Sequence, residues 1–262
     1  MRNIEQLLKI MSRLRDPQQG CPWDLRQTYS TIVPYTLEEA YEVADAIQRG
    51  DMQELRSELG DLLFQVIFYS QIAQEEGHFD FEEVVDVICE KMLRRHPHVF
   101  SDAKFENDEA LRAAWESEKA EERAEKGATD DVSEMAGVAR ALPALIRAEK
   151  LQKRAARVGF DWPNVDGALK KVHEELAEIH HELDQEDLVK AQGELGDLLF
   201  SVVNVTRLVG MDAEQVLSRA NEKFERRFRE MEKLLKESGK ANLHKLTLEE
   251  WDSAWEEIKR QE

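Results

Sequence analysis

Apolar residues recur along this chain at the spacing of an amphipathic α-helix. Near the N-terminus, Ile4, Leu7, Leu8, Met11 and Leu14 follow one another at intervals that place them on one helix face. The alternation of polar and apolar residues that is typical of a half-buried strand is absent from the sequence. The pattern therefore predicts an all-α fold.

Capping residues and helix breakers indicate where further helices begin and end. Thr36 with Glu39 three residues later has the pattern of a capping box, while Gly77 and Pro97 are typical stop signals. In the first half we expect helices at 36–47, 51–74 and from 80 to about 97. In the second half we expect them at 164–183, 186–208, 212–237 and, with Thr247 as the cap, 248–259.

The chain contains an internal repeat. The heptapeptide ELGDLLF occurs at 58–64 and again 136 residues later at 194–200, and the same offset aligns the acidic residues upstream without a gap. Further matches are GCPWD at 20–24 with GFDW at 159–162, and EKMLRR at 90–95 with EKFERR at 222–227. A repeat of this length indicates a duplicated domain.

The repeat predicts two tandem domains of about four helices each. Between them, residues 118–137 are charged and carry almost no large apolar side chain, which is typical of a linker or a solvated helix. We expect an N-terminal domain at 1–118, a charged linker at 119–139 and a C-terminal domain at 140–262.

Charge and composition exclude several classes of partner. A net charge of −19 argues against nucleic acid and membrane surfaces, because proteins that bind them present a basic face. The N-terminal segment lacks the apolar core of a signal peptide, and no apolar run approaches the ~18 residues of a membrane span. Cys21 and Cys89 are typical of reduced thiols, so we expect a cytoplasmic protein.

Four acidic residues in each half are spaced to meet across a pair of helices. Glu39 and Glu42 share one helix face, as do Glu58 and Asp61, and a short turn around Gly50 makes the two helices antiparallel neighbours. Four converging carboxylates repel one another unless cations lie among them. Oxygen ligands without Cys or an obligatory His favour Mg²⁺, with Mn²⁺ as the alternative. The corresponding acids of the second half are Glu175, Glu178, Glu194 and Asp197.

These acids differ from an ordinary solvated helix face, which is the alternative interpretation. A strongly apolar segment at 62–68 follows Asp61 directly, and the whole arrangement occurs twice. Gly60 and Gly196 stand inside the predicted helices, at a cost of ~1 kcal/mol relative to Ala. This cost predicts that a neighbouring helix or a ligand comes close to each glycine.

A basic motif of the form KxxRR follows the acids one helix later in both halves. Cations at this spacing can hold a phosphate chain, although helix C-termini favour cations in any case. Acids for metal ions together with a basic clamp indicate a phosphorylated substrate. The motif residues are Lys91, Arg94 and Arg95 in the first half and Lys223, Arg226 and Arg227 in the second.

The combination of motifs resembles the MazG family of all-α nucleoside triphosphate pyrophosphohydrolases. It consists of ExxE, fifteen further residues, ExxD and KxxRR, together with GCPWD, NEKFERRF and the terminal KRQE. The resemblance covers nearly the whole chain, including the tandem arrangement of the long bacterial members. It implies a fold similar to dimeric dUTPases, Mg²⁺-dependent cleavage of nucleoside triphosphates to monophosphate and pyrophosphate, and a homodimer or larger homo-oligomer.

For the site, the resemblance implies that the C-terminal domain is the main catalytic one. Its four acids would be the metal ligands, although the first half keeps all four of its own. We take Glu175 as the expected general base. Trp255 is interpreted either as a base contact or as a core residue. The implied nucleotide contacts are Lys171, Lys190, Gln192, Gly193, Lys223, Arg226, Arg227 and Trp255.

Two other functions remain as alternatives. One is a helical interaction or regulatory module whose nucleotide pocket is not catalytic. The other is a ferritin-like di-metal oxidase, because Glu178 and His181 form a Glu-x-x-His motif, but the first half has Asp45 at the position of His181 and provides no matching second copy. A zincin site at His173 is excluded because Ala177 stands where the second His is needed.

Substrate breadth and assembly can also be predicted. The acids, Lys and Arg address phosphates and metals that all nucleotides share, and stacking on Trp255 would tolerate any base. We therefore expect activity on ribo- and deoxyribonucleoside triphosphates of all common bases. The apolar run at 62–73 exceeds what one side of a small helical domain buries, which predicts that equivalent domains of two chains pack together.

Overall fold

The chain forms two compact helical units. A computed structural model describes residues 2–107, 109–111, 114–115, 117–118, 122, 133–240 and 242–261. Every regular element among these residues is a helix, so the predicted all-α fold is confirmed. The two units are Met1–Ala120, here unit 1, and Glu121–Glu262, here unit 2. None of the described helices has the length and apolarity needed to cross a membrane.

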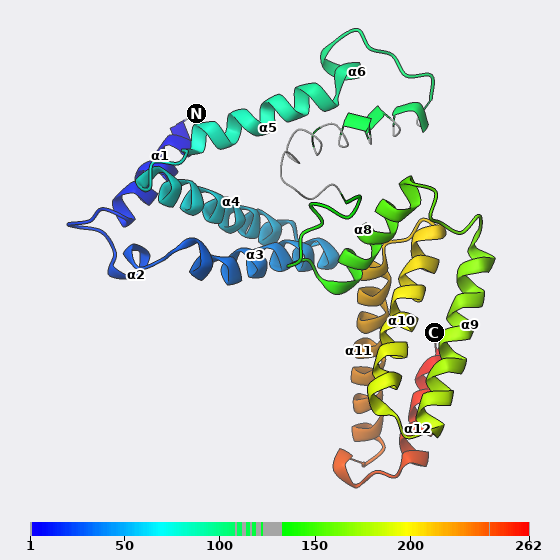
Figure 1. Ribbon diagram of the computed structural model, residues 1–262. Coiled ribbons are helices and arrows are strands. Elements are labelled where there is room, and N and C mark those ends of the chain that lie inside the picture. The colour runs from blue at the N-terminus through cyan, green and yellow to red at the C-terminus, as the bar shows by residue number, and fades with distance from the viewer. Residues whose placement is uncertain are drawn as a thin grey trace. The chain divides into compact units, whose positions relative to one another are not determined.

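Unit 1 is organised around two long antiparallel helices joined by a tight turn. Gly50 makes the turn in the left-handed conformation, with φ of 69°, which glycine adopts at little cost. Asp51 then caps the second helix by accepting hydrogen bonds from the backbone N–H groups of Gln53 and Glu54. The helices are α1 (Arg2–Leu14), α2 (Pro22–Leu25), α3 (Tyr29–Arg49), α4 (Met52–Glu75), α5 (Phe81–Arg95) and α6 (Pro97–Phe100) (Figure 1).

Unit 2 repeats the central helix pair and adds a long C-terminal helix hairpin. Asn164, Asp212 and Thr247 cap its helices as predicted, because the side-chain oxygen of each accepts a hydrogen bond from a backbone N–H of the first turn. The elements are α8 (Ala144–Arg157), α9 (Val165–Asp184), α10 (Leu188–Leu208), α11 (Ala213–Glu237), the 3₁₀ helix η1 (Leu243–Lys245) and α12 (Leu248–Gln261) (Figure 1).

One predicted helix start is wrong. Thr36 does not cap α3, which begins at Tyr29 and continues through Pro34. Thr28 and Thr31 already form a capping box, with the Thr28 N–H donating to Thr31 Oγ1 at 2.8 Å. The helix therefore begins at Tyr29, before the predicted start. Inside the helix, the Thr36 hydroxyl instead hydrogen-bonds the Tyr69 hydroxyl of α4 at 2.8 Å.

A second start is displaced by two residues. Residue 186 was expected to open α10, but Glu186 lies in the left-handed region with φ of 58°. Asp187 is the actual N-cap, accepting from the Lys190 N–H at 3.1 Å. The predicted linker at 119–139 lies mainly outside the described residues.

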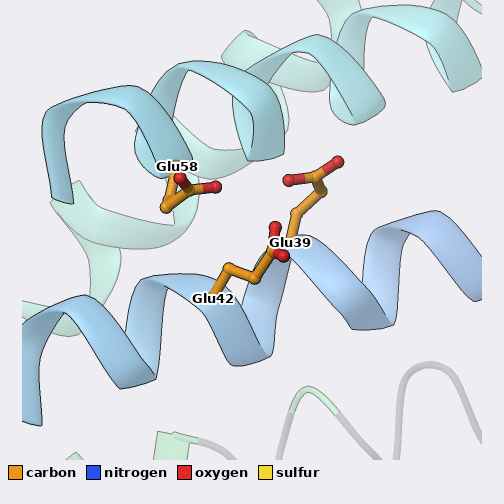
Figure 2. Close-up of side chains that lie close together, drawn as sticks. All are labelled: Glu39, Glu42 and Glu58. Carbon is orange, nitrogen blue, oxygen red and sulfur yellow. The ribbon is translucent and has the colours of Figure 1, made fainter. Parts of the chain in front are cut away.

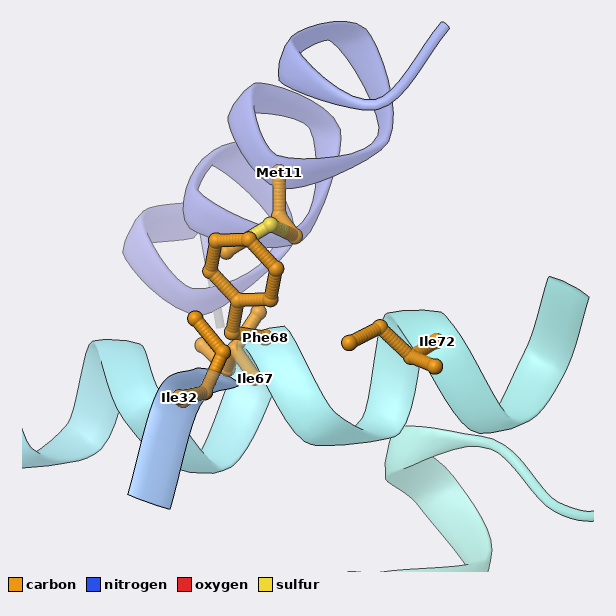
Figure 3. Packing of buried hydrophobic residues seen from close by; sticks show 5 residues of the cluster. All are labelled: Met11, Ile32, Ile67, Phe68 and Ile72. Atoms are coloured by element: carbon orange, nitrogen blue, oxygen red, sulfur yellow. The ribbon is translucent and has the colours of Figure 1, made fainter. Parts of the chain in front are cut away.

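Each unit has its own apolar core. In unit 1, Met11 of α1 packs against Phe68 and its neighbours on α4, and Ile32 of α3 completes the buried cluster (Figure 3). In unit 2, Met231 and Leu235 of α11 pack against Ala254 and Ile258 of α12. In unit 1, α1 therefore packs against the central helix pair. In unit 2, α12 packs against the C-terminal part of α11.

Candidate functional site

The central helix pair of each unit brings acidic side chains together as the spacing predicts. In unit 2, one carboxylate oxygen each from Glu175 on α9 and from Glu194 and Asp197 on α10 lie within 4.8 Å of one another. The fourth acid lies beside this group, because the charge of Glu178 raises the pKa of Glu194. Unit 2 therefore has all four predicted acids at one place, called here the unit 2 acid cluster.

Unit 1 repeats this arrangement. Glu39 and Glu42 extend from α3 toward Glu58 on α4, and their ligand atoms also lie within 4.8 Å of one another (Figure 2). Asp61 is close enough for its charge to raise the pKa of Glu39. These four residues are the unit 1 acid cluster.

Burial and neighbouring charges raise the pKa of one acid in the unit 2 acid cluster and of two acids in the unit 1 acid cluster. Burial is the main cause that raises the pKa of Glu194, followed by the charges of Glu178, Glu175 and Asp197. In unit 1, burial and the neighbouring acids likewise raise the pKa values of Glu39 and Glu58. A divalent cation among the carboxylates would reverse this penalty.

The most buried acid is Glu175, which is 2% exposed. Its Oε1 accepts an ion pair from Lys171 Nζ at 2.8 Å, while its Oε2 is buried and has no hydrogen-bond partner. An unpartnered buried carboxylate oxygen is costly unless a ligand satisfies it. No His or Cys joins either acid cluster among the described residues, and a set of hard oxygen donors fits Mg²⁺ or Mn²⁺.

The implied phosphate contacts on α9 and α10 flank the unit 2 acid cluster. Lys171 lies one turn before Glu175 and bridges Glu174 and Glu175, which raises its pKa. Lys190 stands in the first turn of α10, where it pairs with Asp187 and Glu182. Gln192 and Gly193 are exposed on the turn that precedes Glu194.

The glycines of the repeated heptapeptide do not meet a neighbouring helix. A Cβ placed on Gly60 or Gly196 would meet no described atom within 4 Å, and the same holds for Gly193. The predicted close approach of a helix is therefore wrong within each unit. The open space beside both glycines leaves room for a ligand or for another chain.

The basic motifs lie on α11 and α5. On α11, Lys223 and Arg226 are exposed, and the Arg227 guanidinium lies 5.8 Å from the centre of the Trp255 ring. Trp255 also contacts Phe224 and packs on the core between α11 and α12. On α5, Arg94 pairs with Glu118 at 2.6 Å and Lys91 is half-buried, while the Arg95 carbonyl accepts from the Trp115 indole at 2.7 Å.

A cavity of about 620 Å³ opens beside the unit 2 acid cluster, and the sequence did not indicate it. Lys171, Glu175 and Asp197 form part of its wall, and Gln152 of α8 and Asn204 of α10 form another part. The repeated GFDW segment at 159–162 contributes Phe160, Asp161 and Trp162. The recurrence of this aromatic segment, as GCPWD at 20–24 and GFDW at 159–162, was the sequence signal that could have indicated this wall.

His181 takes no part in either acid cluster. Its side chain is exposed on α9, and the Glu-x-x-His motif therefore does not assemble with the acids of α10. This arrangement removes the structural basis for a ferritin-like di-metal oxidase.

Comparisons with known proteins agree with the geometry. Residues 27–100 and 165–231 match the model of the MazG nucleotide pyrophosphohydrolase domain, and these segments contain both acid clusters. A nucleoside triphosphate pyrophosphohydrolase of Escherichia coli (strain K12) is 52% identical over 267 residues, covering 100% of this chain and 99% of its own. The nucleoside triphosphate pyrophosphohydrolase/pyrophosphatase MazG of Thermotoga maritima is 40% identical, covering 98% and 95%.

Proposed function

Because this chain belongs to the MazG family of nucleoside triphosphate pyrophosphohydrolases, we propose that it hydrolyses nucleoside triphosphates to monophosphates and pyrophosphate with Mg²⁺. The substrates are ribo- and deoxyribonucleotides of all common bases, so the enzyme controls the nucleotide pool. The observation that carries the proposal is the unit 2 acid cluster, in which a buried oxygen of Glu175 has no partner. We further propose that the enzyme works as a homodimer or larger homo-oligomer.

In the proposed mechanism, the acids of α9 and α10 hold Mg²⁺, with Glu175, Glu178, Glu194 and Asp197 as ligands. When bound, the metal neutralises charge on the triphosphate and lowers the pKa of the attacking water. Glu175 accepts the proton of that water, because it is the acid most withdrawn from solvent.

Basic side chains hold the phosphate chain. Lys171 and Lys190 stand one turn before the acids on α9 and α10, so they can bind phosphate oxygens beside the metal. Lys223, Arg226 and Arg227 on α11 supply further positive charge. The backbone at Gly193 has open space beside it, which allows a phosphate to approach closely.

The experiment that tests this function measures pyrophosphate release from the eight common ribo- and deoxyribonucleoside triphosphates, with Mg²⁺ and with EDTA. We expect release from all eight and none with EDTA. A preference above about a thousandfold for one substrate would require ~4 kcal/mol of selective contacts and would contradict the proposed breadth. No release from any triphosphate, with nucleotide still bound, would favour the non-catalytic module instead.

Unit 1 also has a complete set of acids. Its contribution to turnover can be measured in the full chain by disabling one acid cluster at a time. Glu39→Gln disables the unit 1 acid cluster and Glu175→Gln that of unit 2. If unit 2 is the main catalytic domain, only the second change abolishes turnover. Hydrolysis in ¹⁸O-labelled water then shows whether the α- or β-phosphorus is attacked, and label in neither product would exclude direct hydrolysis.

A further inference from the structure

We propose that unit 1 carries a Ca²⁺ site that works without a nucleotide, in which the side-chain amide of Gln65 joins the unit 1 acid cluster as a further oxygen ligand. The cation is held by protein oxygens alone and stabilises the helix pair of α3 and α4. The inference goes beyond the proposed function, because it holds whether or not unit 2 hydrolyses nucleoside triphosphates.

Gln65 is a buried polar side chain that stands at the unit 1 acid cluster. It lies on α4 one turn after Asp61 and is 8% exposed. Its Nε2 is 3.5 Å from Glu39 Oε1, which is the outer limit of a hydrogen bond. Its Oε1 is buried and has no hydrogen-bond partner among the described residues, which is costly unless a ligand satisfies it. The cluster therefore has an unused neutral oxygen beside its carboxylates.

The Gln65 amide can offer this oxygen to a cation by turning over. Rotation about the last side-chain bond exchanges Nε2 and Oε1, which brings the oxygen to the place that faces Glu39. Two ligand atoms at right angles on a cation lie ~3.4 Å apart for Ca²⁺ and ~2.9 Å apart for Mg²⁺. The 3.5 Å between the amide and Glu39 Oε1 matches the larger ion. Without a cation, the NH₂ group is the favourable neighbour of the carboxylate.

The number and kind of oxygens in unit 1 also favour Ca²⁺. This ion takes about six to eight oxygen ligands, which include carboxylates and the carbonyls of Asn and Gln. Mg²⁺ is usually held by roughly one or two carboxylates and completes its shell with water and substrate phosphates, as we propose for unit 2. Unit 1 offers four carboxylates and one amide on two adjacent helices, and three of the carboxylates already have ligand atoms within 4.8 Å of one another (Figure 2).

Unit 1 lacks the lysines that flank the acids of unit 2. The repeat offset places Tyr35 and Glu54 where unit 2 has Lys171 and Lys190, and Glu54 pairs with Arg49 at 2.9 Å. Within the part of the chain that the structure describes, no Lys or Arg forms an ion pair with the four acids of the unit 1 acid cluster. A phosphate chain would meet further negative charge on these helices, whereas a cation is attracted by all four carboxylates.

Calorimetric titration of the full-length Glu175→Gln protein with Ca²⁺, in the absence of nucleotide, is the first test. This background removes the most buried acid of unit 2. We expect one site per chain that binds Ca²⁺ at least about tenfold more tightly than Mg²⁺. Adding Gln65→Leu should weaken Ca²⁺ binding by about tenfold to a hundredfold. Gln74→Leu, on the exposed face of the same helix, is the matched control and should bind Ca²⁺ as the background does.

Hydrogen exchange measured by mass spectrometry locates the cation. Ca²⁺ should slow amide exchange in α3 and α4, which carry the unit 1 acid cluster, and leave α9 and α10 unchanged. In the Gln65→Leu protein, the same protection should require a correspondingly higher Ca²⁺ concentration. Protection confined to α9 and α10 would place the cation in unit 2 and overturn the inference.

The internal repeat provides a second variant if Gln65→Leu does not fold. Position 65 corresponds to Ser201 in unit 2, which is buried to the same extent, 8% exposed. Gln65→Ser therefore keeps a polar group at a buried position of this helix pair but is too short to reach the acids. It should lose Ca²⁺ affinity as Gln65→Leu does.

Two calorimetric results would refute the proposal. Unchanged Ca²⁺ affinity in the Gln65 variants would show that the amide is not a ligand, and Mg²⁺ binding as tight as Ca²⁺ binding would refute the choice of ion. Both are separate from the proposed function. A wild-type protein that releases no pyrophosphate would end that proposal, while the Ca²⁺ titration, which contains no nucleotide, would still decide this one.

Discussion

In a protein whose unit 1 acid cluster is disabled by Glu39→Gln, replacing Glu175 by Gln should abolish both turnover and the response to Mg²⁺, while the same change at Glu174 should abolish neither. The two residues are neighbours on α9, and each accepts an ion pair from Lys171 Nζ at 2.8 Å. The two residues differ in their burial and in the acids that surround them. Glu175 is buried beside Glu194 and Asp197, whereas Glu174 is exposed and belongs to neither acid cluster.

The size of the effect follows from metal linkage. Mg²⁺ at a hundred times its dissociation constant stabilises the folded state by ~2.7 kcal/mol. For a unit of this size each kcal/mol shifts the midpoint of thermal unfolding by about 3 °C, so Mg²⁺ should raise it by about 8 °C. Removing the most buried ligand should reduce that shift to below about 2 °C. Loss of several kcal/mol of charge stabilisation should lower kcat by about a thousandfold.

Thermal unfolding with Mg²⁺ and with EDTA, together with pyrophosphate release, measures both effects in the three proteins. Without metal, Glu175→Gln should be no less stable than Glu174→Gln, because Gln removes one of the mutually repelling charges. If Glu175→Gln kept the Mg²⁺ shift and turnover, the acids would not be the metal site. If both variants lost activity equally, the charge of Lys171 and not metal binding would explain the loss.

Two further predictions concern pH and assembly. Because Glu194 and Glu58 have raised pKa values when folded, their favourable protonated form is lost as pH rises through those values, so the metal-free protein should lose stability above about pH 4.3. Thermal unfolding at pH 5 and pH 7 with EDTA checks this, and Mg²⁺ should restore more stability at pH 7. Leu195 and Leu199, 48% and 60% exposed on α10, should lie in an interface between chains. Replacing both with Lys should shift sedimentation toward monomer, and a wild-type monomer at micromolar concentration would contradict the predicted oligomer.

The acid clusters could be predicted because they depend on strictly local geometry. Glu175 and Glu178 share a helix face whatever the rest of the fold does, and a short turn makes the next helix its neighbour. Helix starts with one strong cap, such as Asp51 and Asn164, were also correct. The start of α3 was not, because Thr28 and Thr36 are both possible caps with a polar partner three residues later, and the helix begins at the capping box of Thr28.

The cavity could not be predicted because its shape depends on how α8 and α10 pack against each other, which the sequence pattern does not specify. Gln152 looks like any polar residue of an amphipathic helix, and its orphaned oxygen appears only once α8 is packed against α10. The helix alternative of the glycine prediction was wrong for a related reason, whereas the ligand alternative stays a prediction. A helical glycine indicates close approach, but Gly60 and Gly196 face open space within their units, so periodicity cannot identify what approaches them.

The two units carry the same acids on their central helix pair and differ in the residues beside them. Position 171 of unit 2 corresponds to Tyr35 in unit 1, so only Glu175 has a lysine partner, while Glu39 has the Gln65 amide at 3.5 Å. In the proposed mechanism, a cation bound by the unit 2 acids would compete with Lys171 for Glu175 and would free its ammonium group for the phosphates. The unit 1 acids have no such exchange, and its core fills the place of Asn204 with Phe68. The two units therefore share the acids and differ in the lysine that pairs with the most buried acid.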